Sequence, residues 1–305
     1  MSLSRIRTLF FSGRGSAWAS LEMTEEGVAW ACLSAGDRDY HSGYIQVPAS
    51  EQSGALDQLR SDHSLHGADL NLVLPPEQYQ VFQTERPAVE ESELASAVRW
   101  KLGDLLDYPV EEAIIDTFDF PEDASRGRGS LINAVCARKS LLQAQVDRVL
   151  EAGFRLRRVD VAELAMRNLM VPLDPEARGV ALLLLREHNG LLVFCRGETL
   201  YMARRIEVGL SSLRDASSQE QTVQSLALEL QRSMDYYESQ LRQVPPRTIY
   251  IAGQPAALPL AGMLSTNVTA EVADLDWSLI TGGEVPDHRS CVALGGLLGD
   301  TGVSS

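Results

Sequence analysis

The chain has 305 residues, of which 45% are hydrophobic and 23% are charged, and its 42 acidic and 27 basic side chains give a formal net charge of -15. This composition is that of a folded protein, and the length normally supports two domains of roughly 100–200 residues each. The negative charge disfavours nucleic acid and anionic lipid as partners. No apolar stretch approaches the roughly 20 residues that a membrane-spanning helix needs.

The cysteines and lysines exclude further classes of site. The chain has only two lysines, Lys101 and Lys139, and no GxxxxGK[ST] phosphate loop. The cysteines are widely spaced and form no CxxC pair, so we expect them to be reduced core residues of a cytosolic protein. We identify no catalytic residue and no metal site, since His63 and His66 have no third ligand nearby in the sequence.

The N-terminal part of the chain begins with a basic and apolar segment over residues 1–15, which carries three arginines and no acid. We expect either an unstructured N-terminus or a weak membrane-surface or partner-docking segment. Residues 16–76 are predicted to form the first part of a first domain. Their pattern predicts, in order, strands over 17–22, 27–33 and 43–47, a helix over 54–62 and a strand over 69–74.

Residues 77–162 are predicted to form an inserted unit. Its pattern predicts a helix that ends at Pro109, a strand over 113–120, a loop over 122–130, a strand over 131–137, a helix that ends at Gly153 and a strand over 155–161. Ten acidic residues stand against three basic ones between Glu85 and Asp119. The negative charge of the chain is therefore concentrated on this unit.

A connecting helix and linker are expected over 163–178, followed by a second domain over 179–275. The second domain is predicted to contain strands over 180–185, 191–195 and 200–208, a long helix that ends before Pro245, a strand over 248–252, a short helix over 258–264 and a strand over 268–272. Residues 276–305 are predicted to return to the first domain through a helix over 291–298 and to end in a tail. Three strands followed by a helix occur twice, which indicates an internal duplication.

This duplication resembles the actin, Hsp70 and hexokinase superfamily. Three segments are similar to the PilM family of actin-like pilus-assembly proteins and to its shorter relatives, the MshI family of mannose-sensitive haemagglutinin (MSHA) pilus biogenesis: AVRWKLGDLLDYPVEE at 97–112, LELQRSMDYYES at 228–239 and IYIAGQ at 249–254. The resemblance covers roughly residues 16–300. It implies a duplicated α/β fold of the ribonuclease H-like type, with two domains flanking a cleft and an inserted α/β subdomain in the first, as in PilM and FtsA.

The resemblance also implies a nucleotide cleft, in which two Asp-x-Gly hairpins hold the phosphates and magnesium of ATP. The corresponding cofactor positions of the first hairpin are Glu22 and Thr24, and those of the adenosine loop are Gly253 and Gln254. Two further carboxylates follow Thr24, and carboxylates repel a triphosphate by roughly 1–4 kcal/mol per close pair.

The second hairpin has Leu184 and Arg186 where the family has its acid. We therefore expect a pseudo-ATPase with no cofactor. The alternatives are an active ATPase of pilus or type II secretion assembly, which would bind ATP and magnesium, and a sugar-kinase-like phosphotransferase.

Finally, the resemblance implies a partner. PilM-like proteins bind the cytoplasmic N-terminal peptide of a single-pass inner-membrane protein, PilN or its MshJ-like counterpart, in a groove between the first domain and the inserted unit. We expect that groove to involve Trp100, Leu105, Tyr108, Ile114 and Phe118, and the acidic insertion to attract a basic peptide. The expected function is a cytoplasmic scaffold at the inner-membrane face, in contact with other pilus assembly components.

Overall fold

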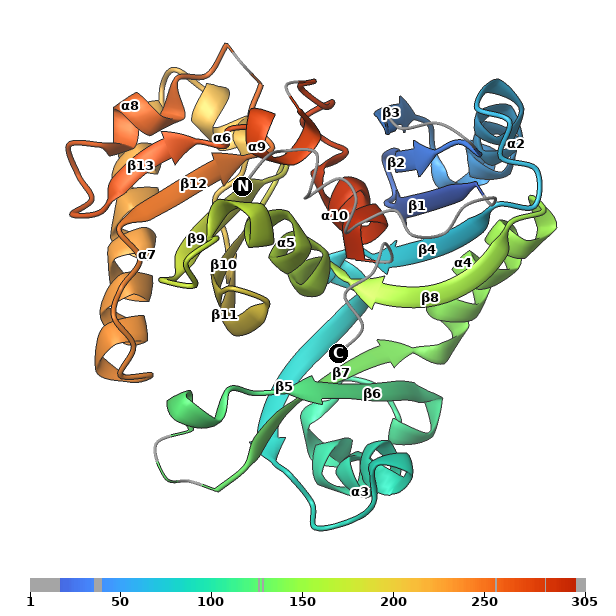
Figure 1. The fold of residues 1–305 in the computed structure, drawn as a ribbon, viewed down its shortest axis with the longest axis horizontal. Coiled ribbons are helices and arrows are strands. Elements are labelled where there is room, and N and C mark those ends of the chain that lie inside the picture. The colour runs from blue at the N-terminus through green and yellow to red at the C-terminus, as the bar shows by residue number, and fades with distance from the viewer. Residues whose placement is uncertain are drawn as a thin grey trace.

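The computed structural model describes residues 17–35, 40–125, 127, 129–255, 257–282 and 284–299. The predicted N-terminal segment 1–15 and the C-terminal tail lie outside the described residues. Two five-stranded sheets and one three-stranded sheet form three units of the chain, and Figure 1 shows the two larger sheets on either side of a pair of central helices.

The first sheet has the strand order β3-β2-β1-β4-β8. Its strands are β1 (Trp18–Met23), β2 (Gly27–Leu33), β3 (His41–Gln46), β4 (Asp69–Leu74) and β8 (Arg155–Val161). The first three run antiparallel as a meander, whereas β4 pairs in parallel with both β1 and β8. The outer face is covered by α2 (Gln52–Asp62), after the 3-10 turn η1 (Ala49–Glu51), and by α4 (Lys139–Glu151). Leu21, Leu56 and Leu70 belong to the core beneath them.

The second sheet repeats this arrangement with the order β11-β10-β9-β12-β13. Its strands are β9 (Val180–Leu185), β10 (Gly190–Arg196), β11 (Thr199–Ile206), β12 (Thr248–Ala252) and β13 (Glu271–Asp274). Its helices are α6 (Leu210–Arg214), α7 (Gln219–Ser239) and α8 (Leu260–Leu264). The apolar side of α7, including Leu226 and Leu230, packs on the outer face of the sheet. The matching strand order and directions confirm the predicted duplication.

Two helices lie between the sheets and join the domains: α5 (Ala162–Met170), which continues into the 3-10 turn η6 (Val171–Leu173), and α10 (Cys291–Gly299). The short helix α9 (Ser278–Thr281) precedes α10. Because α10 is apolar all round, it is buried on all sides, as such helices usually are. Asn71 and Asn168 donate hydrogen bonds of 3.0 Å to the carbonyls of Gly296 and Gly295, which fixes α10 against the first sheet and α5.

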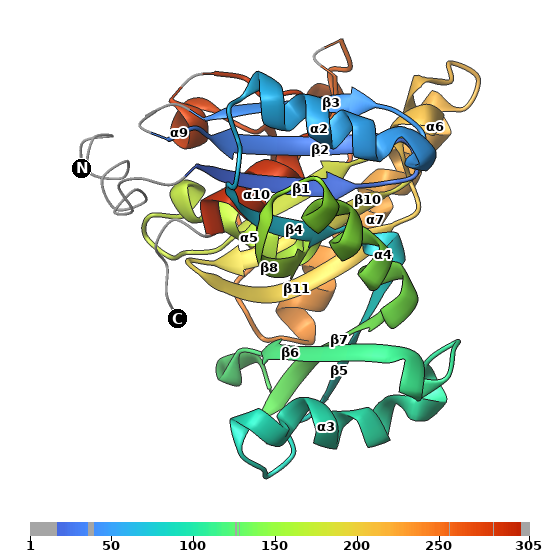
Figure 2. The same ribbon diagram turned by 90° about the vertical axis from the view of Figure 1, so that its right-hand side faces the viewer.

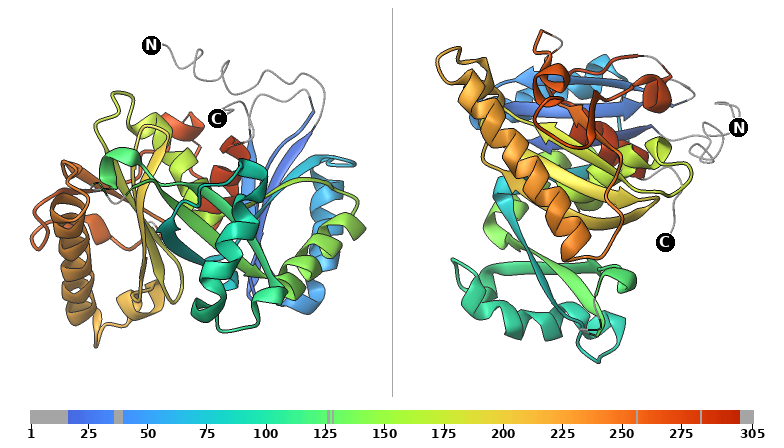
Figure 3. Two further views of the ribbon diagram at one scale, coloured as in Figure 1. Left: turned by 90° about the horizontal axis from the view of Figure 1, so that it is seen from below. Right: turned by 90° about the vertical axis from the view of Figure 1, so that its left-hand side faces the viewer.

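The insertion projects from the two larger domains on one side (Figures 2 and 3). It consists of the antiparallel sheet β5-β7-β6, formed by β5 (Tyr79–Glu85), β6 (Ala113–Asp119) and β7 (Leu131–Arg138), with α3 (Glu91–Leu102) on one face. Short 3-10 turns connect these elements: η2 (Pro76–Gln78), η3 (Gly103–Leu105), η4 (Val110–Glu112) and η5 (Glu122–Ala124).

The insertion differs from its predicted form in two ways. Strand β5 was not predicted, because its sequence YQVFQTE does not alternate: Val81 and Phe82 are adjacent, and three polar residues follow them. The predicted end of the insertion at residue 162 is wrong, because β8 pairs in parallel with β4 and Val149 of α4 packs in the core of the first domain. The sequence shows where strands lie but not which strand each one pairs with. The last strand of the insertion sheet is therefore β7, which ends at Arg138.

Candidate functional site

A cleft lies between the two domains, where the β1–β2 and β9–β10 hairpins face each other. It encloses a cavity of about 970 Å³. The residues around the cavity are Glu22, Thr24, Glu25, Glu26, Ala29, Tyr44, Gln46, Pro75, Glu77, Gln78, Leu141, Leu184, Leu185, Arg186, Glu187, His188, Asn189, Leu210, Gly253, His288, Arg289 and Val292. Acidic side chains therefore come from both hairpins, and the chief cationic side chains are Arg186 and Arg289.

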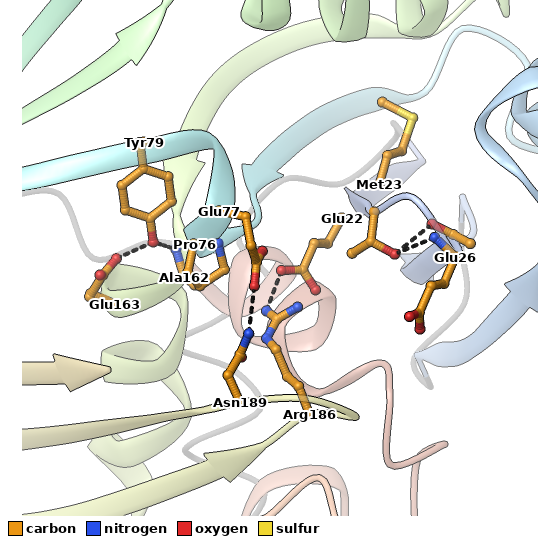
Figure 4. Close-up of polar contacts among 12 residues, drawn as sticks. Glu22, Met23, Glu26, Pro76, Glu77, Tyr79, Ala162, Glu163, Arg186 and Asn189 are labelled. Atoms are coloured by element: carbon orange, nitrogen blue, oxygen red, sulfur yellow. Dashed lines mark hydrogen bonds and ion pairs between the residues drawn. The ribbon is translucent and has the colours of Figure 1, made fainter. Parts of the chain in front are cut away.

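An ion pair joins the two hairpins across this cleft (Figure 4). Arg186, directly after β9, donates a hydrogen bond from Nη2 to Oε1 of Glu22 in β1. Glu22 is only 2% exposed, and its burial raises the pKa of the carboxyl, although Arg186 acts in the opposite direction. Arg186 thus supplies the positive charge that a buried carboxylate requires.

Two weaker contacts accompany the pair. The amide of Asn189 donates a hydrogen bond of 2.9 Å to Glu77, and His188 Nε2 lies 3.5 Å from Glu26 Oε1. The first contact connects the β9–β10 hairpin of the second domain to the segment that leads into the insertion (Figure 4), and the second connects the hairpin to the first domain. The hairpin is therefore held to the opposite wall of the cleft at three points.

Three of the four predicted cofactor positions line the cavity, namely Glu22, Thr24 and Gly253. Gln254 does not, because its amide donates a hydrogen bond of 2.7 Å to Asp274 Oδ1. Gly253 has a φ of 84°, and a Cβ atom there would lie 2.2 Å from the carbonyl oxygen of Leu185. The close approach of β12 to β9 requires this glycine whether or not a ligand binds.

A second junction joins the insertion to both domains. The hydroxyl of Tyr79 donates a hydrogen bond to Glu163 on α5 and accepts one of 3.1 Å from the backbone N–H of Ala162. Arg205 of β11 donates to the carbonyls of Pro76 and Tyr79, the latter at 2.8 Å. Burial raises the pKa of both Tyr79 and Glu163. This Tyr79 junction therefore connects the insertion, the central helix α5 and the second domain.

A groove of about 600 Å³ runs beside this junction, between the insertion and the second domain. Its lining comes from β5, β6 and β7 on one side and from β10, β11 and the end of α7 on the other: Gln80, Val81, Phe82, Gln83, Phe118, Phe120, Asn133, Glu163, Leu191, Leu200, Tyr201, Met202, Ala203, Arg204, Arg205, Tyr236 and Leu241. Val81 and Phe118 belong to the face of the insertion sheet opposite α3.

A third junction closes the other end of the groove. Asp123, in the turn after β6, accepts hydrogen bonds of 2.7 Å from Arg196 and 3.0 Å from the hydroxyl of Tyr201. Phe120 and Leu131, on either side of this turn, pack in the core of the second domain. The insertion is thus attached to the second domain at both ends of the groove.

The five predicted partner-binding residues do not form one surface. Phe118 lines the groove, and Ile114 is exposed on the same face of the insertion sheet. Trp100 and Leu105 lie on α3 and η3, on the opposite side of that sheet. Tyr108 packs in the core of the insertion, with the Arg138 guanidinium 4.7 Å from its ring centroid.

The groove also lies elsewhere than expected. The resemblance implies a peptide groove between the insertion and the first domain, whereas the wall opposite the insertion in this groove comes from β11 and α7 of the second domain. Sequence reasoning missed this wall and the pairing of Arg186 with Glu22. An arginine in place of an expected acid, opposite a retained glutamate, was the signal for that pair.

Neither a metal site nor a membrane span is found in the described part of the chain. Within residues 17–35, 40–125, 127, 129–255, 257–282 and 284–299, no three histidine, cysteine or acidic side chains are grouped so that they could hold a metal ion. In the same ranges, every helix is too short or too polar to cross a bilayer.

No family model matches the chain, and no curated protein is similar to it in sequence. Solved structures do resemble it. A chain of the PilM-PilN type IV pilus biogenesis complex is 16% identical with a TM-score of 0.68, and the match covers 93% of this chain and 99% of that one. The cytoplasmic domain of EpsL, an inner-membrane component of the type II secretion system of Vibrio cholerae, is 16% identical with a TM-score of 0.51 over 77% and 82% of the two chains.

A Bacteroides thetaiotaomicron protein with an actin-like ATPase fold is 10% identical with a TM-score of 0.51, and the match covers 92% of this chain and 97% of that one. Identities this low bear on the fold alone. The strand orders of the two large sheets lead to the same result. The chain has the duplicated two-domain fold of the actin-like ATPases, with an α/β subdomain inserted in its first domain.

Proposed function

We propose that the protein is a non-catalytic actin-like scaffold of a type IV pilus assembly machine of the MSHA type. In this role it docks the cytoplasmic N-terminal peptide of a PilN- or MshJ-like inner-membrane protein and lies at the cytoplasmic face of that membrane. The likeness in fold to a chain of the PilM-PilN complex and to the cytoplasmic domain of EpsL supports this class of function. The groove between the insertion and the second domain is the observation that carries the docking proposal.

The groove suits an extended peptide for two reasons. First, β11 is the outer strand of the second sheet in the described residues, so one side of its backbone has no strand partner and can pair with an added strand. Second, Val81 and Phe118 supply apolar contacts from the uncovered face of the insertion sheet. The acidic insertion would attract a basic peptide and orient it as it approaches.

Filling the groove is expected to abolish docking. Ala203 is an exposed residue of β11 in the groove wall, so Ala203→Trp would occupy the space of the peptide without disturbing the core. We expect at least about a tenfold loss of affinity, measured by fluorescence anisotropy with a labelled peptide. The peptide would be the N-terminal cytoplasmic segment of the single-pass membrane protein encoded in the same operon.

Leu228→Trp is the matched control, because Leu228 is exposed on α7 and is not part of the groove lining. It should leave the affinity unchanged. Equal affinities of the Ala203→Trp variant and the unmodified protein would refute docking in this groove. Absence of saturable binding by the unmodified protein would refute the docking function itself.

We also propose that the cleft does not use ATP. Magnesium at a triphosphate requires free carboxylates, whereas Glu22 is paired with Arg186 and the second hairpin contributes an arginine in place of the acid. Glu25, Glu26 and Glu77 add further negative charge around the cavity. These residues do not fit a magnesium–triphosphate complex, which supports the pseudo-ATPase hypothesis over the ATPase and sugar-kinase alternatives.

Calorimetric titration tests this second proposal. ATP added with magnesium up to millimolar concentration is expected to give no saturable heat, and incubation should release no phosphate above the rate of the buffer. Micromolar affinity together with slow phosphate release would instead favour the active ATPase. Transfer of phosphate to a hexose would favour the sugar-kinase alternative.

A further inference from the structure

The end of α3 presents the largest exposed apolar side chain of the insertion. Trp100 is 87% exposed, and Leu105, in the 3-10 turn that continues the helix, is 57% exposed. Trp100 lies in the last turn of α3 and Leu105 in the 3-10 turn that follows, so both belong to the same end of the insertion helix. Tryptophan is enriched at protein–protein interfaces, where its large apolar ring is buried against a partner.

Three exposed acidic residues are close to Trp100 and Leu105 in the sequence. Glu93 is seven residues before Trp100 on α3, which places the two on one side of the helix, and Asp104 lies in the 3-10 turn that follows the helix. Asp107 follows Leu105 closely. All three acids are exposed, and none takes part in an ion pair with another described residue. We call Glu93, Trp100, Asp104, Leu105 and Asp107 the tip surface.

The basic side chains of the insertion do not neutralise the tip surface. Arg99 donates hydrogen bonds of 2.6 and 3.1 Å to the carbonyls of Val110 and Ala113. Lys101 donates to the carbonyl of Glu85 at 3.2 Å, and Arg86 forms ion pairs with Glu91 and Asp119. Arg86, Arg99 and Lys101 thus each bind a group outside the tip surface, and none of them forms an ion pair with its three acids.

We propose that the tip surface is a second docking site, which binds a basic segment of another protein through an apolar side chain packed on Trp100. The chemistry of the tip surface determines the partner: it should have lysine or arginine residues that face Glu93, Asp104 and Asp107, and an aliphatic or aromatic residue on the indole. An arginine of the partner can also stack on the indole ring. An anionic membrane does not fit this surface, because its charge has the same sign.

The second site goes beyond the proposed peptide groove and is independent of it. The groove uses the face of the insertion sheet opposite α3, whereas the tip surface is on the α3 side of that sheet. With one protein bound at each site, the insertion would bridge the two proteins. This gives the chain two separate attachment points, which a molecule that holds an assembly together needs.

Designed peptides test the site without knowledge of the natural partner. The probe is a labelled 14-residue amphipathic peptide of leucine and lysine, compared with a leucine–glutamate peptide of the same pattern and with a lysine–serine peptide. We expect the leucine–lysine peptide to bind at least about tenfold more tightly than either of the others, as measured by anisotropy. Trp100→Ala should weaken its binding at least about tenfold, and Asp104→Asn with Asp107→Asn should reduce the salt dependence of its affinity.

Val244→Ala is the matched control, since Val244 is 81% exposed in the second domain. It should bind the leucine–lysine peptide like the unmodified protein, and so should Ala203→Trp. Equal affinity of the leucine–lysine peptide for the Trp100→Ala and Val244→Ala variants would overturn the proposal. It would mean that the peptide is attracted to the acidic protein in general and not to the tip surface. Binding of anionic vesicles that depends on Trp100 would also overturn it. Failure of the groove peptide to bind would leave these results unchanged and would refute only the proposed function.

Discussion

Replacing Arg186 with alanine is expected to lower the free energy of unfolding by about 3–5 kcal/mol at neutral pH. The substitution leaves Glu22 buried at 2% exposure without its positive partner. A buried carboxylate without a partner either remains charged at high cost or takes up a proton, and both outcomes destabilise the folded state. Urea denaturation followed by circular dichroism measures the loss.

The loss should depend on pH with a definite sign. Burial already raises the pKa of Glu22 in the folded protein, and removing Arg186 removes the influences that lower it. Between its ordinary pKa and the raised folded value, the folded state binds more protons than the unfolded state, so stability falls as pH rises through that window. The variant should therefore be closest to the unmodified protein in mild acid and should differ most above the raised pKa.

Arg214→Ala is the control for this experiment. Arg214 also pairs with a glutamate, Glu187, at 3.0 Å, but both side chains are well exposed, so its loss should change stability by less than about 1 kcal/mol. A second variant isolates the buried charge: Glu22→Gln added to Arg186→Ala should restore part of the stability. If Arg186→Ala and Arg214→Ala cost the same, the cross-cleft pair is of no structural importance.

Gly295→Ala is expected to destabilise the protein by about 3 kcal/mol or more, because it forces apart two central helices. A Cβ atom at Gly295 in α10 would lie 2.1 Å from the carbonyl oxygen of Ala165 in α5 and 2.7 Å from its carbonyl carbon. Both atoms are backbone, so no side-chain rotation can relieve the clash. Thermal and urea unfolding should both show the loss.

Gly262→Ala is the matched control, because Gly262 is also a helical glycine but has no atom within 4 Å of the position of its Cβ. Alanine there should increase stability by about 0.5–1 kcal/mol through its better helix propensity. The two substitutions are chemically identical and are expected to have opposite effects. A neutral result for Gly295→Ala would mean that the helices can separate freely, contrary to their close packing.

The fold was predictable to the extent that it is encoded in local patterns. The spacing of Leu226, Leu230 and Met234 predicted α7, and the apolar run 180–185 predicted β9. The repeated order of three strands and a helix predicted the duplication. Such patterns depend on neighbours along one element, and the sequence shows those neighbours directly.

The site was less predictable, because its features depend on contacts between distant residues. Arg186 and Glu22 are 164 positions apart, and the parallel pairing of β8 with β4 joins two strands that the insertion separates in the chain. Gln254 stands at an expected cofactor position, yet its side chain contacts Asp274 because β12 and β13 are neighbours. Trp100 and Phe118 are close in the chain, but a sheet separates them. In each case tertiary structure decides what the residue faces.

The attachment of the insertion at two points has a mechanical consequence. The Tyr79 junction and the contacts of Asp123 with Arg196 connect the insertion to the second domain at opposite ends of the groove, while η2 ties it to the first. Because the insertion is attached to both large domains, a rotation of one against the other must also deform the insertion. The width of the groove and the angle between the two large domains are therefore coupled. A ligand that widens the groove also rotates the domains relative to each other.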